Sequence, residues 1–222
     1  MTYQSARIGL LGGSFNPAHG GHRRISLFAM EALGLDEVWW LVSPGNPLKS
    51  KAGMAPLNAR FASAQKQARR ARIVPTVIER DLSQGKGTRY TSHTLKALTQ
   101  RYPAKQFVWL MGSDNLAQFH LWRDWRGIAR RMPIAVIARP GYDAAAMSSP
   151  AMAWLRKFHI PAANLTRDSL SKSPALVTLR FDPDPRSATA LRRDNPDWAE
   201  QYASARLRDP LTHHLIESPS PV

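Results

Sequence analysis

The sequence predicts an α/β fold, a doubly wound, Rossmann-like parallel sheet with helices on both faces. Strand-like and helix-like stretches alternate five times over about the first 140 residues. The strand-like runs are apolar almost throughout, as strands buried on both faces of a sheet are. The length of 222 residues, with 43% apolar and 21% charged residues, suffices for one domain with a substantial core.

The first strand is expected over residues 7–11, where an apolar run ends at two glycines. A helix is expected over residues 21–33, because apolar residues recur there at helical spacing and Gly34 ends the pattern. The later strands are expected over 37–43, 72–78, 106–111 and 133–139, and the later helices over 57–71, 91–101, 115–119 and 125–131. This alternation predicts a parallel sheet, since parallel strands need crossover connections.

The pattern is weaker beyond residue 141. We expect a helix over 152–158, a strand over 176–181 and a short helix over 188–194. The chain is therefore predicted to form a single domain over 1–217, in which 141–217 add a small helical extension. Residues 218–222 (SPSPV) are expected to be a frayed tail.

The composition limits the possible functions. A balance of 31 basic and 16 acidic residues gives a net charge of +15, which attracts phosphates and polyanions but is also met on the solvated surfaces of Arg-rich proteins. The absence of cysteine excludes disulfides, cysteine-ligated zinc and a thiol nucleophile. No apolar run is long enough for a membrane span, and no secretory signal pattern is visible, so we expect a cytoplasmic protein.

The segment GGSFNPAHGGH, residues 12–22, lies between the first predicted strand and its helix. Gly12 and Gly13 allow a sharp turn and close approach of a ligand to the backbone. The start of the helix offers N–H groups and a partial positive charge. His19 and His22 are three residues apart, so they share one face of the first turn and can donate hydrogen bonds to phosphate oxygens. The segment therefore predicts a phosphate site.

Other interpretations of this segment are weaker. A His-x-x-His pair can bind a metal, but the chain has no cysteine and no third ligand lies nearby in sequence. The pair could also be incidental, although the adjoining Gly-Gly-Ser turn speaks against this. The segment matches neither the dinucleotide fingerprint G-x-G-x-x-G nor the phosphate loop G-x-x-x-x-G-K-[ST].

This segment resembles the first motif of the nucleotidyltransferases with a His-x-Gly-His signature. Its form, GGSFNPxHxGH, is most similar to that of the bacterial nicotinate-nucleotide adenylyltransferases. Four later segments resemble further motifs of that family in the same order: PGNPLKSK (44–51), TRYTSHTL (88–95), WLMGSDNLAQFHLWRDW (109–125) and RSATALR (186–192). The resemblance spans roughly residues 6–200.

Three positions depart from the family pattern. His93 stands where the family usually has an aspartate, so no acidic role is carried to that position. Ala188 replaces a serine, which removes one hydroxyl from the late phosphate-binding motif. Arg123 stands where some relatives have an aromatic residue, so only its backbone N–H is expected to serve as the family's residue does.

The resemblance implies transfer of the adenylyl group of ATP to nicotinate mononucleotide, which gives nicotinate adenine dinucleotide and pyrophosphate in NAD biosynthesis. The acceptor phosphate attacks the α-phosphorus in line, without a covalent intermediate. Because that phosphate is already anionic, the reaction needs no general base, and catalysis reduces to positioning two anions and stabilising charge. The implied cofactor is Mg²⁺, held mainly by the ATP phosphates and water rather than by a protein metal site.

The resemblance also implies roles for particular residues. The catalytic set is His19, His22 and Lys49. The ATP-binding set is Gly12, Gly13, Ser14, His19, Gly21, His22, Gly112, Asp114, Ser187, Thr189 and Arg192. The mononucleotide-binding set is Ser14, Phe15, Asn16, Lys49, Thr91, Trp122 and Arg123.

For several of these residues, a purely structural role stays open as an alternative to ligand binding. Trp122 could pack in the core, Asp114 could cap a helix, Lys49 could be simple loop charge, and the late motif could be only a helix start. Trp39, Trp40 and Trp109 lie in predicted strands and are expected in the core.

The function also has alternatives. The same chemistry could act on nicotinamide mononucleotide or phosphopantetheine. A different class, a basic RNA-binding domain, would need exposed aromatic residues interleaved with arginine, which the sequence does not show. We expect ATP and nicotinate mononucleotide as partners and neither nucleic acid nor membrane, and the sequence does not indicate an oligomeric state.

Overall fold

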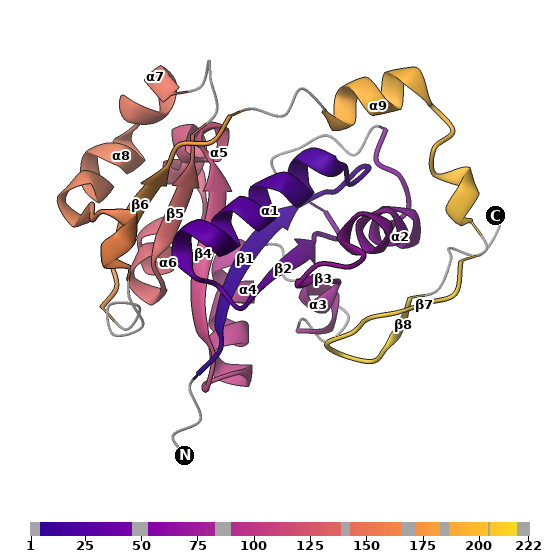
Figure 1. Cartoon of the computed structure of the whole chain (residues 1–222), viewed down its shortest axis with the longest axis horizontal. Coiled ribbons are helices and arrows are strands. Elements are labelled where there is room, and N and C mark those ends of the chain that lie inside the picture. The colour runs from indigo at the N-terminus through magenta and orange to yellow at the C-terminus, as the bar shows by residue number, and fades with distance from the viewer. Residues whose placement is uncertain are drawn as a thin grey trace. The chain divides into compact units, whose positions relative to one another are not determined.

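The computed structural model describes residues 5–45, 53–82, 90–138, 143–165, 172–182, 187–203 and 205–216. Six strands form one sheet in the order β3-β2-β1-β4-β5-β6 (Figure 1). These strands are β1 (Arg7–Gly13), β2 (Glu37–Val42), β3 (Ile73–Thr76), β4 (Gln106–Gly112), β5 (Ile134–Ile137) and β6 (Leu176–Leu179). The order reverses beside β1, as in a doubly wound sheet, so the predicted α/β fold is confirmed.

The main helices alternate with these strands. They are α1 (Gly20–Leu33), α2 (Leu57–Ala68), α4 (Thr91–Arg101), α5 (Ser113–Gln118), α6 (Trp125–Arg131), α8 (Pro150–Leu155) and α9 (Ala188–Asp194). The shorter helices are α3 (Ile78–Asp81), α7 (Asp143–Met147), η1 (Phe119–Leu121), η2 (Arg156–Phe158), η3 (Ala162–Asn164) and η5 (Glu200–Tyr202). The bounds of α4, α6 and α9 are those predicted. No described helix is long and apolar enough to cross a membrane.

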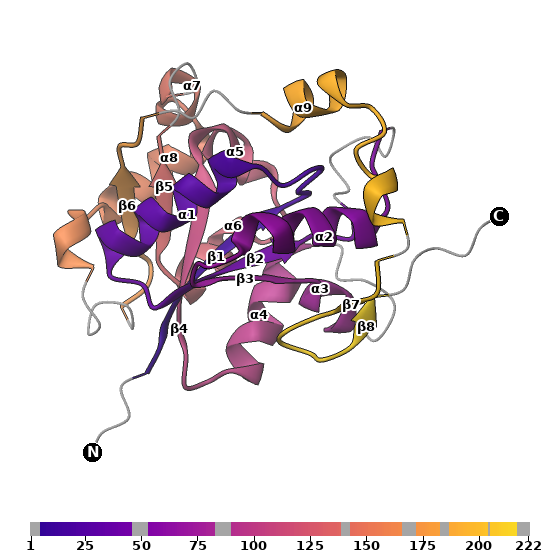
Figure 2. The ribbon, with the colours of Figure 1, turned by 45° about the vertical axis from the view of Figure 1, so that its right-hand side comes forward.

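Strands β1, β4, β5 and β6 pair in parallel. Leu11 lies opposite Leu110, so β1 and β4 end at the same edge of the sheet. Gly9 lies in the middle of β1, where an added Cβ would come within 2.8 Å of a Leu35 methyl and 2.9 Å of a Leu110 methyl. Glycine at this position therefore lets apolar side chains pack against the strand. Figure 2 shows α1 on one face of these strands and α4 on the other.

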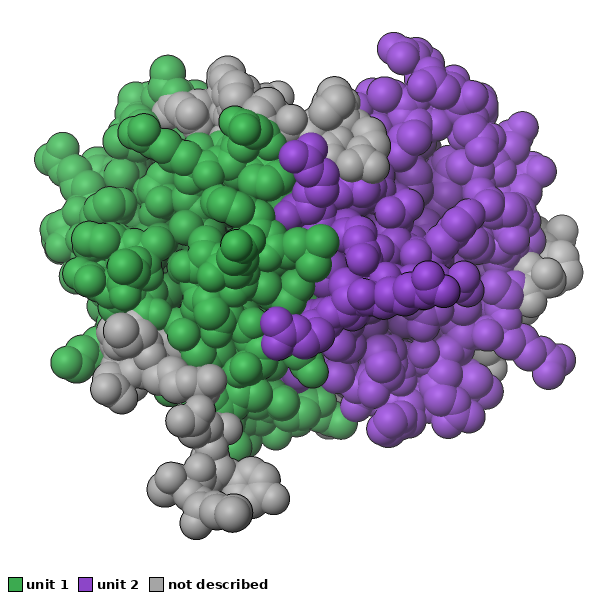
Figure 3. All heavy atoms as spheres, viewed as in Figure 1, with its two compact units in different colours: residues 1–11, 25–38, 90–183 green, residues 12–24, 39–89, 184–222 purple. Residues whose placement is uncertain are grey.

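The chain divides into two compact units (Figure 3). Unit 1 comprises residues 1–11, 25–38 and 90–183, and unit 2 comprises residues 12–24, 39–89 and 184–222. The interpretation of residues 1–217 as one domain stays a prediction.

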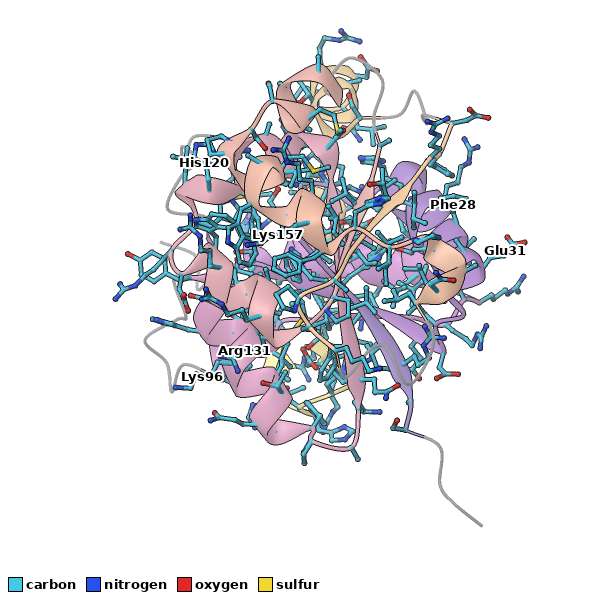
Figure 4. All side chains as sticks on the ribbon, turned by 90° about the vertical axis from the view of Figure 1, so that its left-hand side faces the viewer. Phe28, Glu31, Lys96, His120, Arg131 and Lys157 are labelled. Atoms are coloured by element: carbon cyan, nitrogen blue, oxygen red, sulfur yellow. The ribbon has the colours of Figure 1, made fainter. Side chains whose placement is uncertain are left out.

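In unit 1, aromatic rings join α8 to α6. The rings of Trp125 and Trp154 meet edge to face, with centroids 5.4 Å apart. Arg130 and Lys157 place their cationic groups 5.7 and 5.3 Å from the centroid of the Trp154 ring. Figure 4 shows Arg131 and Lys157 on the same side of this unit. Cations thus lie beside the aromatic contact between α6 and α8.

In unit 2, a short antiparallel pair, β7 (Leu207–Arg208) and β8 (Leu215–Ile216), follows η5. Asp209, between these strands, is fully buried. Its carboxylate accepts hydrogen bonds from the Thr76 hydroxyl at 2.8 Å and the Val77 N–H at 2.6 Å. The C-terminal part therefore contains, besides the predicted short helix α9, a strand pair that the sequence did not indicate, because strands of two residues leave no periodic pattern to detect.

The same contacts explain why β3 is shorter than predicted. The expected strand over 72–78 ends at Thr76, whose hydroxyl accepts the N–H of Ile78 at 3.0 Å and turns the chain into α3. The expected helix over 57–71 also ends early, because Arg69 adopts an extended conformation with ψ of 138°. The end of β3 thus involves the Thr76 hydroxyl and its distant partner Asp209, and the end of α2 involves the backbone of Arg69. Hydrophobic periodicity reports neither.

Replacing Thr76 with valine is expected to lower the free energy of unfolding by about 1 kcal/mol, because Asp209 loses a donor and Ile78 loses an acceptor in the interior. Chemical denaturation measures the change. Thr99→Val is the matched control, since the Thr99 hydroxyl only bonds to carbonyls of its own helix near the surface. Equal effects of the two variants would contradict the assignment.

Candidate functional site

The turn between β1 and α1, in unit 2, is built around Phe15. This residue has a φ of 48°, a left-handed conformation that is uncommon for a bulky side chain. Its ring is 2% exposed and stacks on Trp40, with centroids 5.0 Å apart and planes 19° apart. The Asn16–Pro17 peptide that follows is cis. The buried ring therefore anchors the turn in the core of unit 2.

His19 and His22 lie together at the start of α1, as their spacing predicts. Their ring centroids are 3.9 Å apart, and the His22 ring lies 4.9 Å from that of Phe15. Both histidines are half-buried. The His22 ring thus packs against Phe15, and both histidines stay partly accessible to a ligand.

Backbone hydrogen bonds determine which nitrogen of each ring carries its proton. Nδ1 of His22 accepts the N–H of His19 at 3.2 Å, and Nδ1 of His19 accepts the N–H of Gly21 at 3.1 Å. A neutral imidazole whose Nδ1 accepts a hydrogen bond carries its proton on Nε2. Both rings are therefore held as Nε2–H donors, which suits them to bind phosphate oxygens.

Asn16 links the turn to two other segments of unit 2. Its side-chain amide donates to the Gly53 carbonyl at 2.9 Å and accepts the Ala55 N–H at 3.1 Å. Its backbone carbonyl accepts a hydrogen bond from the Arg192 guanidinium at 2.5 Å. The side chain of Asn16 is thus committed to holding the turn, and its role in mononucleotide binding stays a prediction.

Helix α9 brings the late motif together. Ser187 is the N-cap, and its hydroxyl accepts the N–H of Ala190 at 3.1 Å. The Arg192 guanidinium also donates to the Thr189 hydroxyl at 3.2 Å. Ser187 therefore caps the start of α9. The phosphate-binding roles of Ser187, Thr189 and Arg192 stay predictions.

Arg60 of α2, which is 2% exposed, also contacts the turn, although the sequence did not indicate it as a site residue. Its guanidinium donates to three backbone carbonyls, those of Ser14, Ser43 and Ala55. Burial lowers the pKa of the Arg60 guanidinium to about 10, so it stays charged near pH 7. The one available signal was its position four residues before Ala64, on the apolar side of the predicted helix.

Two predicted ATP-binding residues lie where β4 meets α5, in unit 1. Gly112 is the N-cap residue of α5 and adopts an extended conformation. Asp114 lies in the first turn of the helix, two residues after the N-cap. Its ribose-binding role stays a prediction.

The predicted mononucleotide-binding residues of unit 1 lie on α4 and after η1. The half-buried Trp122 meets Phe119 and Trp109 edge to face, at centroid distances of 5.4 and 6.3 Å. Arg123 places its guanidinium 4.8 Å from the centroid of the Tyr90 ring, and Thr91 begins α4. Trp122 therefore packs against two aromatic side chains and also keeps part of its surface exposed to solvent.

The core and the remaining site predictions can be placed as well. Trp39, Trp40 and Trp109 are at most 2% exposed, which confirms their prediction as core residues. Lys49 lies outside the described residues. Within the described part of the chain, no group of three or more His, Asp or Glu side chains could hold a metal ion.

Comparisons with known proteins agree in pointing to one family. The model of the cytidylyltransferase-like family matches residues 10–194. A probable nicotinate-nucleotide adenylyltransferase of Erythrobacter litoralis is 64% identical over 210 residues, 95% of this chain and 94% of that protein. One of Parvibaculum lavamentivorans is 51% identical over 186 residues, 84% of this chain and 90% of that protein.

A solved structure supports the fold. The nicotinic acid mononucleotide adenylyltransferase of Plasmodium falciparum, complexed with NaAD, superposes with a TM-score of 0.60 over 85% of this chain and 83% of that one. Its sequence identity is 16%, so this likeness concerns the fold alone.

Proposed function

The chain belongs to the cytidylyltransferase-like family, and within it to the nicotinate-nucleotide adenylyltransferases, and we infer that it transfers the adenylyl group of ATP to nicotinate mononucleotide. The products are nicotinate adenine dinucleotide and pyrophosphate, so the enzyme serves NAD biosynthesis. The observation that carries this inference is the pair of Nε2–H donors on His19 and His22, at the start of a helix that follows a sharp turn.

The reaction is a direct displacement at phosphorus. An oxygen of the mononucleotide 5′-phosphate forms a bond to the α-phosphorus of ATP, and the bond from that phosphorus to the bridging oxygen of pyrophosphate breaks. No proton has to move at the attacking oxygen, because the phosphate is already anionic. The protein therefore contributes by holding two polyanions in line and stabilising the charge that builds up.

The residues of the turn suit this task. His19 and His22 donate from Nε2 to the ATP phosphates, with His22 on the α-phosphate, where charge changes during the reaction. Ser14 and the N–H of Phe15 receive the mononucleotide phosphate. Ser187, Thr189 and Arg192 contact the β- and γ-phosphates, and Lys49 adds a mobile charge on phosphate.

A divalent cation is general in nucleotidyl transfer, and we propose Mg²⁺ here. The turn offers N–H donors rather than carboxylates, and the described residues hold no acidic or histidine cluster of three. Mg²⁺ would therefore be bound by the ATP phosphates and water, where it offsets phosphate charge. The side chains of the turn need only bind the phosphate oxygens that the cation leaves accessible.

The acceptor is tested by offering nicotinate mononucleotide, nicotinamide mononucleotide and phosphopantetheine in turn, with ATP and Mg²⁺, and measuring pyrophosphate release. We expect kcat/KM for nicotinate mononucleotide to exceed that for the other two acceptors by about tenfold or more, because groups that face a carboxylate bind a neutral amide less well. A preference for either other acceptor would overturn the assignment, while leaving the phosphate chemistry in place.

The alternative of an RNA-binding domain finds little support. The structure does bring arginine and tryptophan together, at Trp154, but this half-buried ring already contacts the rings of Trp125 and Phe158. RNA bases stack on accessible aromatic faces, and these ring contacts leave less of Trp154 available to a base. Tight RNA binding without pyrophosphate release from ATP is the result that would favour this alternative.

A further inference from the structure

Arg60 joins three segments of unit 2 from the interior. Its Nη1 donates to the carbonyl of Ser14 at 2.8 Å and to that of Ser43 at 2.7 Å, and its Nε donates to the carbonyl of Ala55 at 2.9 Å. Ser14 belongs to the turn after β1, Ser43 follows β2, and Ala55 precedes α2. One side chain therefore connects the phosphate-binding turn to the two neighbouring segments.

Only one of the three bonded peptide groups has an N–H to direct. Ser43 and Ala55 each precede a proline, so their peptide groups carry no hydrogen-bond donor. The Ser14 carbonyl shares its peptide group with the N–H of Phe15. In a trans peptide these two groups point in opposite directions, so the bond from Arg60 aims the Phe15 N–H away from the guanidinium.

The N–H of Phe15 is suited to bind a ligand. It has no acceptor among the residues that the structure describes. Its peptide group adjoins the left-handed conformation of Phe15, so a rotated peptide would present the Ser14 carbonyl in its place. A carbonyl oxygen facing a phosphate is repulsive, whereas an N–H is attractive. The orientation of this peptide group therefore decides whether it adds a donor or a repulsive carbonyl to an anion bound at the turn.

The positive charge of Arg60 also favours binding of an anion at the turn. All three hydrogen-bond partners of the guanidinium are neutral carbonyls, and it forms no ion pair within the described part of the chain. In the protein interior the positive charge is poorly screened, so it also favours an anion bound at the turn.

We propose that Arg60 is a positioning residue for nucleotide binding: it holds the Ser14–Phe15 peptide so that the Phe15 N–H faces the mononucleotide phosphate. The proposal rests on the proposed function, because it takes the mononucleotide as the ligand of the turn. Arg60 itself is buried behind the turn and acts through the peptide group and through its charge.

The test is the variant Arg60→Lys, which keeps a cation but cannot reproduce the planar fork that bonds all three carbonyls. We expect KM for nicotinate mononucleotide to rise about tenfold or more, and KM for ATP to rise clearly less. Phe61→Leu is the matched control, because Phe61 is a fully buried apolar residue of the same helix. It should lower stability without separating the two KM values. Arg60→Met removes the charge as well, and thermal unfolding shows whether each variant folds.

A pH profile separates positioning from a merely structural role. Lysine has a lower pKa than arginine in water and burial lowers it further, so the variant should lose its charge at a lower pH than the wild type. KM for the mononucleotide should then rise with pH in Arg60→Lys, while in the wild type it stays flat up to about pH 9, below the pKa of about 10.

The two possible failures are distinguishable. Wild-type protein that forms no dinucleotide from ATP and nicotinate mononucleotide would refute the proposed function. Active wild-type protein, together with an Arg60→Lys variant whose KM values and pH profile match those of Phe61→Leu, would refute the positioning role alone.

Discussion

Replacing His22 with alanine is expected to lower kcat by about 10²–10³-fold while the fold stays intact, because loss of one preorganised donor to a developing charge has that effect. The ring is half-buried, and we expect the stack of Phe15 on Trp40 to persist without it, because those two rings contact each other directly. Steady-state kinetics measure the loss, and thermal unfolding checks the fold. His159→Ala is the control, since His159 is exposed and has no assigned role.

Two further variants test which nitrogen of His22 matters. The amide nitrogen of glutamine reaches toward the position of Nε2, whereas that of asparagine reaches only toward Nδ1. Because Nδ1 already accepts the His19 N–H, the predicted donor from this ring to phosphate is Nε2. His22→Gln should therefore retain more activity than His22→Asn. Near-normal turnover of His22→Ala, or the opposite order of the two amides, would contradict the assigned role.

Sequence patterns predicted those parts of the fold that local periodicity controls. The bounds of α4, α6 and α9 follow from helical spacing within each segment. The end of β3 does not, because it depends on Asp209, which lies more than 130 residues further along the chain. A pattern within one segment cannot report a partner that distant.

The candidate site, too, combines features that local sequence spacing predicts with features that depend on distant partners. The closeness of His19 and His22 follows from their spacing, and the structure adds the backbone bonds that assign their protons. The contact of Arg192 with Asn16 joins residues 176 positions apart, and only the resemblance to a family placed these two residues in one site. Arg60 was missed because a single arginine in an amphipathic helix is read as solvated, whereas its carbonyl partners come from three separate segments.

Replacing Trp122 with alanine is expected to raise KM for nicotinate mononucleotide about tenfold or more and to change KM for ATP little, because an aromatic face stacked on a flat ring contributes about 1–3 kcal/mol. Trp122→Phe keeps an aromatic face and should recover much of the loss. Steady-state kinetics with each substrate varied in turn measure both constants.

A packing role for Trp122 makes a different prediction. The ring also contacts Phe119 and Trp109, so loss of packing alone would lower stability and disturb both substrates alike. Trp154→Ala supplies the comparison, because Trp154 is a second half-buried tryptophan of unit 1 with aromatic contacts but no predicted part in the site. If both variants lose stability and only Trp122→Ala separates the two KM values, the ring binds the mononucleotide. Equal changes in both KM values for Trp122→Ala would instead assign Trp122 to the core.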